Sequence, residues 1–279
     1  MTTIYKSEAG ARAVERQYRE ALRAWPVPGE ELRIPTREGE TFVLASGPRD
    51  APPLVLLHGS GANTSMWRGD IARWATHFRT YAVDIVGEPG LSAPARPALT
   101  SDALELWLDD VLTGLGLSRT PIVATSLGAW VALRFVTRHP ERVTRLALLC
   151  PGGIGRQQYG WMPAAIALRL FGRAGLRRSA RIVTGLDSVE VAAALDQVAL
   201  TFSHFKPRTE RLPIFSDAEL GRLTMPVLAI AGARDVMFDS AETARRLRDC
   251  VPDATVHLLP DVGHAILGQT DTVLEFLRR

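Results

Sequence analysis

The sequence is poor in cysteine and has no long apolar run. Cys150 and Cys250 are the two cysteines among 279 residues. Two are too few for a disulfide framework in a chain of this length, so we expect two reduced thiols. No uninterrupted apolar run approaches the roughly 20 residues of a membrane span. The segment from Met1 to Glu20 is polar and charged, and it lacks the apolar core of a signal peptide. These absences favour a cytoplasmic protein with no membrane partner.

The chain also has little excess of either charge, and it lacks the common cofactor motifs. Lys and Arg number 33 against 30 Asp and Glu, a net charge of +3, without a run of five like charges. A nucleic-acid partner is therefore not expected. We find no H-E-x-x-H, no paired Cys/His spacing, no G-x-G-x-x-G and no Walker loop. We therefore expect no metal and no cofactor. The sequence leaves the oligomeric state open.

An alternation of short apolar runs and longer amphipathic ones follows an N-terminal helix expected over residues 8–25. Several of the runs are apolar without alternation, such as the Leu-Val-Leu-Leu of residues 54–57. Strands that are buried on both faces have this pattern, which predicts a mostly parallel, doubly wound α/β sheet covered by helices. The predicted strands are 41–46, 54–57, 80–84, 122–125, 146–149, 227–231 and 255–259. The predicted helices are 66–77, 101–115, 127–138, 240–250 and 271–279.

One stretch interrupts the alternation. Residues 154–217 carry no strand signal, whereas 161–171 and 189–202 are typical of helices rich in Ala, Leu and aromatic residues. We interpret 154–217 as an inserted helical cap, with 1–153 and 218–279 forming the core. The alternative is a set of ordinary crossover helices, but most crossover connections are far shorter.

Three candidate catalytic residues follow three different predicted strands. Ligands of open α/β sheets bind at the carboxyl ends of the strands, so residues at these positions are the candidates. The run Ala124-Thr-Ser126-Leu-Gly128 joins a strand to a helix and resembles the nucleophile elbow G-x-S-x-G, with Ala in place of the first Gly. Small residues on either side leave room for the tight turn that exposes the serine hydroxyl.

The acid and the base come later in the chain. Asp235 follows the strand at 227–231, and His264 lies in a Gly-containing loop after the strand at 255–259. Asp239 competes with Asp235, although its place before Ser240 is typical of a helix cap. The order nucleophile, acid, base is that of the α/β hydrolases. We therefore predict a triad of Ser126, Asp235 and His264, with an ionisation of His264 near its reference value of about 6.5.

The sequence resembles the bacterial carboxylesterases of the naproxen-esterase type within the α/β hydrolases. The resemblance covers nearly the whole chain and implies the α/β-hydrolase fold and hydrolysis of carboxylic esters, including aryl-propionate esters, by a cytoplasmic enzyme. The family has Gly where this chain has Ala124. The matching stretches are 24–27 (Ala-Trp-Pro-Val), 45–48 (Ala-Ser-Gly-Pro), 51–59 (Ala-Pro-Pro-Leu-Val-Leu-Leu-His-Gly), 81–85 (Tyr-Ala-Val-Asp-Ile), 126–128 (Ser-Leu-Gly) and 215–220 (Phe-Ser-Asp-Ala-Glu-Leu).

The resemblance also suggests the oxyanion hole. One donor should be the N–H of Leu127, the residue after the nucleophile, and the fold's H-G-x pattern points to the N–H of Ser60 as the other. We interpret His58 as a packing and hydrogen-bonding residue of that loop rather than a second base. The turn from Asp84 to Ser92 is expected to be structural.

The predicted function is hydrolysis of a small-molecule carboxylic ester through an acyl-enzyme on Ser126. Carbon–carbon bond hydrolases and acyltransferases use the same triad and remain alternatives, and a non-enzymatic binding protein could keep the same fold. An apolar underside of the cap would make a pocket wall, which predicts a preference for bulky or aromatic acyl groups. The candidate wall residues are Trp161, Met162, Leu170, Phe171, Phe202 and Phe205.

Overall fold

The computed structural model describes residues 4–186 and 192–279, and eight strands form one sheet in this part of the chain. The strands are β1 (Gly29–Thr36), β2 (Gly39–Ser46), β3 (Pro53–Leu57), β4 (Arg79–Val83), β5 (Thr120–Thr125), β6 (Val143–Leu149), β7 (Val227–Gly232) and β8 (Ala254–Leu259). The helices that pack on the sheet or precede it are α1 (Glu8–Arg23), α2 (Ile71–Trp74), α3 (Ala103–Gly114), α4 (Leu127–Val136), α8 (Asp217–Leu220), α9 (Ser240–Cys250) and α10 (Thr270–Arg278).

The sheet is mostly parallel, in the order β1-β2-β4-β3-β5-β6-β7-β8. Strands β3 to β8 run parallel to one another, whereas β1 and β2 form an antiparallel hairpin at one edge. All seven predicted strands are present. The prediction missed β1, which has Ile34 as its only buried residue. A strand that is exposed at the edge of a sheet needs few apolar residues, so β1 carries too weak a pattern to detect.

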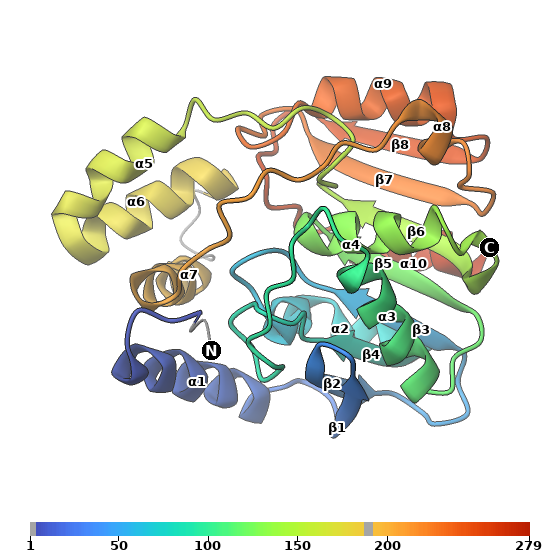
Figure 1. Ribbon diagram of the computed structural model, residues 1–279, viewed down its shortest axis with the longest axis horizontal. Coiled ribbons are helices and arrows are strands. Elements are labelled where there is room, and N and C mark those ends of the chain that lie inside the picture. Colours follow the sequence, from blue (N-terminus) through green and yellow to red (C-terminus); the bar gives the residue numbers. More distant parts are fainter. Residues whose placement is uncertain (1–3, 187–191) are drawn as a thin grey trace.

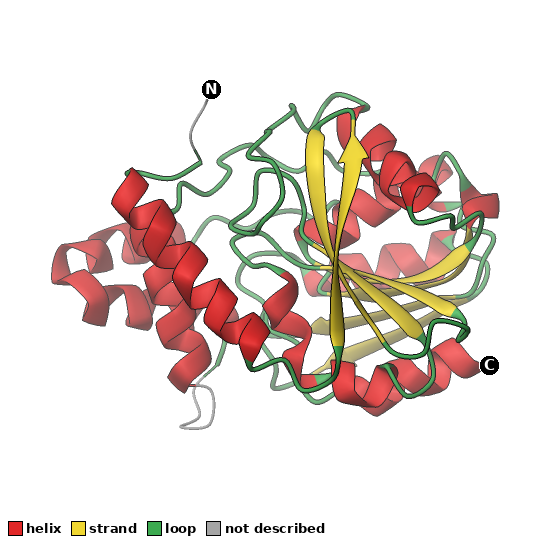
Figure 2. Ribbon diagram, turned by 90° about the horizontal axis from the view of Figure 1, so that it is seen from below, coloured by secondary structure: helices red, strands yellow, loops and turns green. Residues whose placement is uncertain are grey.

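Helices cover both faces of the sheet, as Figures 1 and 2 show. Val55 and Leu57 of β3 face the layer made by α3, α4 and α9, while Leu54 and Leu56 face the layer of α2 and α10. Each of these four side chains is fully buried. At roughly 25 cal/mol per Å² of apolar surface removed from water, burial on both faces is what holds this parallel sheet together. The predicted fold class is confirmed.

The predicted helix at 66–77 is divided in two. A 3-10 helix over Thr64–Gly69 is followed by the short α2, and Asp70 lies at the junction. The apolar residues Trp67, Ile71 and Trp74 still face the core. Their spacing of four and three was compatible with one continuous helix, but Gly69 is a poor helix former and the chain turns there.

Between β6 and α8, the described residues form three α-helices beside the sheet (Figure 1). They are α5 (Met162–Leu168), α6 (Gly172–Thr184) and α7 (Ala192–His204), and a 3-10 turn over Arg169–Phe171 joins the first two. The prediction combined α5 with this turn and missed α6. The predicted helix at 189–202 corresponds to α7, and its first residues, 189–191, lie outside the described part.

The N-terminal segment fixes the end of α7. Helix α1 lies beside α7 in Figure 1. The backbone N–H of Lys6 donates to the His204 carbonyl over 2.8 Å, and that of Lys206 donates to the Ile4 carbonyl over 2.9 Å. A Cβ at Gly10 would come within 2.8 Å of the His204 ring, so α1 and α7 can approach this closely only with glycine there. Within the described residues, we find no helix both long and apolar enough to cross a membrane.

Candidate active site

Ser126 lies on a sharp turn between β5 and α4. Its backbone has φ 51° and ψ −109°, a conformation that non-glycine residues rarely adopt and that costs roughly 1–3 kcal/mol. The turn is possible because its neighbours are small: a Cβ at Gly128 would come within 2.5 Å of the His58 carbonyl oxygen. Ala124 is fully buried in the strand, so the methyl group is accommodated without loss of the turn.

The other two predicted residues lie beside the serine. His264 Nε2 is 3.1 Å from Ser126 Oγ, and His264 Nδ1 is 2.7 Å from Asp235 Oδ2. The other carboxylate oxygen of Asp235 accepts the backbone N–H groups of Met237 at 2.7 Å and Phe238 at 3.2 Å. These two bonds hold the carboxylate in a fixed orientation. The three residues follow β5, β7 and β8, and Ser126 and His264 are 138 positions apart in the chain.

Asp239 has a different place. It is the N-cap of α9, and its side chain accepts the backbone N–H of Glu242 over 2.9 Å. This confirms that Asp239 is a helix cap, as its position before Ser240 predicted.

Cys150 is a neighbour that the sequence prediction missed. Its sulfur lies 3.8 Å from His264 Nε2, the same nitrogen that faces Ser126. Burial opposes a positive charge on the ring, but Cys150 and the hydrogen bond to Asp235 together favour it, and they raise the pKa of His264 above its ordinary 6.5. The expected ionisation near 6.5 is therefore too low. The signal was present in the sequence, because Cys150 directly follows a predicted strand.

The loop after β3 passes beside the nucleophile, and His58 organises it. A Cβ at Gly59 would lie 3.4 Å from the Cβ of Ser126. His58 is fully buried, and burial lowers its pKa, so the ring is neutral. Its Nε2 accepts the backbone N–H of Ile85 over 2.9 Å, so the proton is on Nδ1, which donates to the Gly59 carbonyl over 2.8 Å. Both ring nitrogens therefore have partners, one within the loop itself and the other in the segment that follows β4.

Two backbone N–H groups are available for a ligand, one on Leu127, directly after the serine, and one on Ser60, directly after Gly59 in the loop beside it. Within the described part of the chain, neither the Ser60 N–H nor the Leu127 N–H donates to a protein acceptor. The Leu127 group is at the first position of α4, where the N–H groups have no partner inside the helix and the positive end of the helix dipole lies. Unpaired donors in this position can stabilise a developing oxyanion.

The sequence profile of the alpha/beta hydrolase family matches residues 54–276.

The chain belongs to the alpha/beta hydrolase family.

Two relatives from Bacillus subtilis strain 168 match most of this α/β hydrolase. Carboxylesterase YbfK is 32% identical, with 93% of this chain and 89% of that protein covered. A protein called uncharacterized carboxylesterase nap is 33% identical, with 91% and 87% covered. Among solved structures, naproxen esterase from Bacillus subtilis superposes with a TM-score of 0.83 at 28% identity, covering 98% of both chains. These matches confirm the resemblance to carboxylesterases of the naproxen-esterase type.

The helices between β6 and β7 contact the site of this α/β hydrolase at two places. At the end of α6, the Thr184 carbonyl accepts the backbone N–H of Ala265, next to His264, over 2.9 Å. A Cβ at Gly185 would come within 2.7 Å of the Cα of Gly263, so backbone packs directly on backbone. On α7, the ring of Phe202 approaches the position of a Cβ at Gly61 to 2.5 Å.

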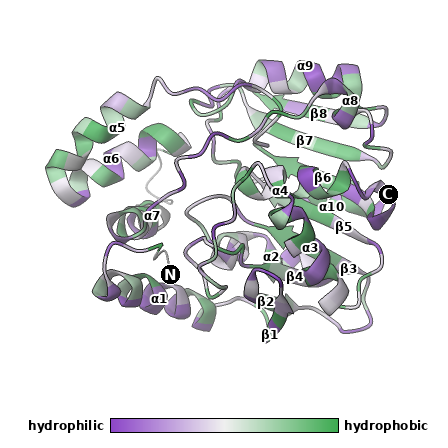
Figure 3. Cartoon of the chain, in the orientation of Figure 1, coloured by the Kyte–Doolittle hydropathy of each residue, from purple (hydrophilic) through white to green (hydrophobic). Residues whose placement is uncertain are grey.

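The predicted wall residues therefore differ in whether they are buried near the site or exposed to solvent. Phe202 contacts the loop after β3, and Phe205 is fully buried and forms an edge-to-face pair with Phe202. Leu170 and Phe171, by contrast, are 87% and 70% exposed, and Met162 is also exposed. The structure places these three side chains in solvent and shows no contact between them and the site. Figure 3 shows the apolar colouring of α5 at this outer end of the molecule.

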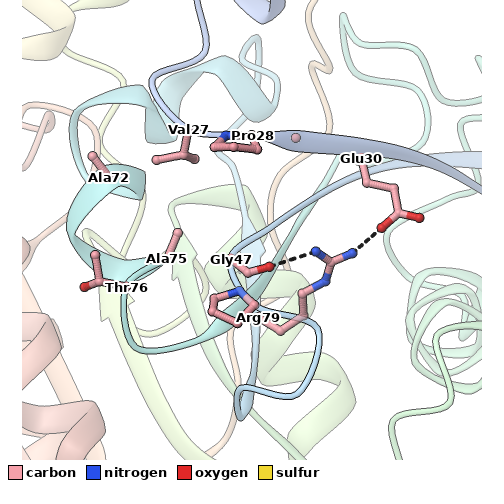
Figure 4. Close-up of a pocket in the computed structure, with 10 residues that line it drawn as sticks. Val27, Pro28, Glu30, Gly47, Ala72, Ala75, Thr76 and Arg79 are labelled. Atoms are coloured by element: carbon pink, nitrogen blue, oxygen red, sulfur yellow. Dashed lines mark hydrogen bonds and ion pairs between the residues drawn. The ribbon is translucent and has the colours of Figure 1, made fainter.

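A hollow of about 360 Å³ lies elsewhere on the surface, between α2 and the start of β1 (Figure 4). Its one cation, Arg79, pairs with Glu30 and donates to the Gly47 carbonyl over 2.9 Å. None of the three triad residues lines it. The arginine is already satisfied, so the hollow offers no chemistry comparable to that around Ser126.

Other site predictions concern metal ligands and thiols. In residues 4–186 and 192–279, no three or more His, Cys, Asp or Glu side chains gather to hold a metal ion. Cys150 and Cys250 are both free thiols. Asp84 is structural in the described fold: its buried carboxylate accepts the Tyr18 hydroxyl at 2.9 Å and the backbone N–H of Leu91 at 2.8 Å.

Proposed function

We propose that the protein is a carboxylesterase that forms an acyl-enzyme on Ser126. The observation that carries the proposal is the continuous chain of hydrogen-bonding distances from Ser126 Oγ through the His264 ring to Asp235. The relatives named carboxylesterases, which match this chain along most of its length, support the reaction type.

In this mechanism, Ser126 Oγ attacks the ester carbonyl carbon while His264 Nε2 takes the hydroxyl proton. Asp235 remains ionised, keeps the proton of the neutral ring on Nδ1 and stabilises the imidazolium that forms. The imidazolium then protonates the leaving alcohol, which leaves an ester on Ser126. Water attacks this acyl-enzyme by the same route and releases the carboxylic acid.

The developing negative charge on the carbonyl oxygen needs two donors. We assign them to the backbone N–H groups of Ser60 and Leu127, which have no acceptor in the described protein. Leu127 follows the nucleophile in the chain, and Ser60 follows Gly59, whose Cβ position lies 3.4 Å from the Ser126 Cβ. The removal of one donor of this type costs about 10²–10³ in kcat.

We also propose that residues 154–217 act as a cap on the site and that the enzyme prefers bulky or aromatic acyl groups. Support comes from apolar rings around the triad. The Phe238 ring lies 5.3 Å from the His264 ring, centre to centre, and Phe202 approaches the loop of Ser60. Each additional methylene buried against such side chains gains about 0.8 kcal/mol, or roughly fourfold in binding.

Labelling with a fluorophosphonate, together with ester hydrolysis, tests the proposal. We expect the wild-type protein to be labelled on Ser126 and to cleave aryl esters. Ser126→Ala should lose labelling and lower kcat by about 10⁴-fold or more. The matched control is Ser101→Ala, which changes an exposed serine whose hydroxyl makes only local hydrogen bonds. The proposal is wrong if folded Ser126→Ala retains activity within about tenfold of the wild type.

A further inference from the structure

Glu88 is a buried carboxylate that the mechanism does not use. It lies in the turn after β4 and is 0% exposed. Its Oε2 accepts the backbone N–H of Gly61 over 2.6 Å and the hydroxyl of Ser60 over 3.2 Å. The carboxylate therefore bonds the loop that carries one of the two proposed oxyanion donors.

A buried charge of this kind is costly and needs compensation. Burial raises the pKa of Glu88, while the Gly61 N–H, Arg208, Arg96 and Ser60 oppose that rise. Arg208 comes from the segment after α7, its side chain is 6% exposed, and its Nε lies 3.8 Å from Glu88 Oε1. In the described chain, Oε1 has no hydrogen-bond partner, so the hydrogen bonds of Glu88 are concentrated on the loop. A purely structural ion pair would instead aim its oxygens at the arginine.

The two peptide groups on either side of the Ser60 Cα are held from opposite directions. The carbonyl of the Gly59–Ser60 peptide accepts a hydrogen bond from His58. In a trans peptide, the N–H points away from the carbonyl, so this bond directs the Ser60 N–H away from the buried His58 ring. The N–H of the next peptide, at Gly61, is held by Glu88. With both peptide planes fixed, φ and ψ of Ser60 have little freedom.

We propose that Glu88 is a positioning residue for the oxyanion hole: its carboxylate holds the Ser60–Gly61 peptide and thereby aims the Ser60 N–H at the substrate oxygen. This inference rests on the proposed esterase function. Without Glu88, the Gly61 N–H has no acceptor, and the Ser60–Gly61 peptide can rotate. Ser60 is then held from the His58 side alone, so its N–H gains orientational freedom and loses part of the preorganisation that gives it catalytic value.

The test compares two Glu88 variants with a control that disturbs the same buried cluster. Glu88→Gln keeps the side-chain volume and one acceptor oxygen, and Glu88→Leu removes every acceptor. Arg208→Met removes the charged neighbour but leaves the bond from Gly61 to Glu88 intact. We expect kcat to fall by about tenfold in Glu88→Gln and about 10²-fold in Glu88→Leu, with KM changed less than about threefold. Arg208→Met should lower the Tm while kcat stays within about twofold of the wild type.

A pair of inhibitors separates positioning from loss of structure. An aryl trifluoromethyl ketone reacts with Ser126: the Oγ–C bond forms, the carbonyl π pair moves onto oxygen, and the hydroxyl proton passes to His264. The matched methyl ketone binds without adding. For the Glu88 variants, the inhibition constant of the trifluoromethyl ketone should rise by the same factor as kcat/KM falls. That of the methyl ketone should not change.

The outcomes distinguish this inference from the function on which it rests. If Ser126→Ala is inactive but both Glu88 variants keep wild-type kcat and inhibition, Glu88 has no positioning role. The same conclusion holds if the Glu88 variants weaken both ketones equally, because a loosened fold would do that. If Glu88→Leu does not fold, the isosteric Glu88→Gln still decides the question. An active Ser126→Ala would instead overturn the esterase mechanism itself.

Discussion

Replacement of Asp235 by asparagine is the sharpest test of the triad, because the structure determines how the amide must sit. One oxygen of Asp235 accepts the backbone N–H groups of Met237 and Phe238, and the other faces His264. In Asp235→Asn, the amide oxygen keeps the two backbone donors, since an NH₂ group there would oppose two N–H groups. The NH₂ group therefore faces the His264 ring. It donates to Nδ1, which forces the ring proton onto Nε2.

That tautomer cannot act as the base. With Nε2 protonated, the nitrogen that lies 3.1 Å from Ser126 Oγ has no lone pair to accept the hydroxyl proton. We predict a loss in kcat on the order of 10³–10⁴. This corresponds to about 4–5.5 kcal/mol of transition-state stabilisation, at 1.36 kcal/mol per factor of ten. The fold should be little affected, because asparagine has nearly the same shape and keeps the two backbone hydrogen bonds.

Asp239 provides the control for this experiment. Asparagine is as good a helix N-cap as aspartate, so Asp239→Asn should change neither kcat nor the Tm appreciably. Asp239→Ala should destabilise the protein by about 1 kcal/mol and leave kcat unchanged. The assay is steady-state hydrolysis of an aryl ester with melting curves on the same samples. Wild-type-like kcat in Asp235→Asn, or a large loss confined to Asp239→Asn, would refute the assignment of the acid.

Three further predictions concern the base, its sulfur neighbour and the cap. His264 must be neutral to accept a proton, and its pKa is raised. We therefore expect kcat/KM to increase with pH through one ionisation above 6.5. A flat profile from about pH 5 to 9 would contradict this. Cys150→Ala should move that midpoint to lower pH, since the sulfur favours the charged ring; an unchanged or higher midpoint would count against the contact. Phe202→Ala should change the ranking of esters, from acetyl to aryl-propionyl, in kcat/KM. The kcat/KM of an ester should fall by about fourfold for each methylene contact that it loses. Phe171→Ala changes a solvent-exposed ring and should keep the wild-type ranking. Equal effects of the two phenylalanine changes would show that the pocket lies elsewhere.

The sequence alone was sufficient for the parallel core. Runs such as Leu146–Leu149 of β6 are apolar at every position because both faces of a parallel strand are buried, and this composition is visible without coordinates. The positions of Ser126, Asp235 and His264 after three strands were visible for the same reason. In a parallel sheet, strand ends meet at one edge, so residues distant in the chain can be expected together there.

The rotation of each helix and the path of each loop were decided only by the tertiary structure. Leu170, Phe171 and Phe202 have the same apolar character, and no local pattern separates the two side chains in solvent from the one that reaches the loop of Ser60. The α6 helix was missed because its four arginines hide the few small residues that pack against the neighbouring helices.

The same limit applies to the polar neighbours of the site. Glu88 lies 27 residues from the Gly61 N–H that it holds, and Cys150 lies 114 residues from the His264 nitrogen that its sulfur meets. A carboxylate or thiol in a sequence carries no mark of its partner. The strand order brings these groups together, because β4 is the neighbour of β3 and only β7 separates β6 from β8. Such contacts are set by chain topology and side-chain direction, whereas the periodicity of a sequence reports only which faces are buried.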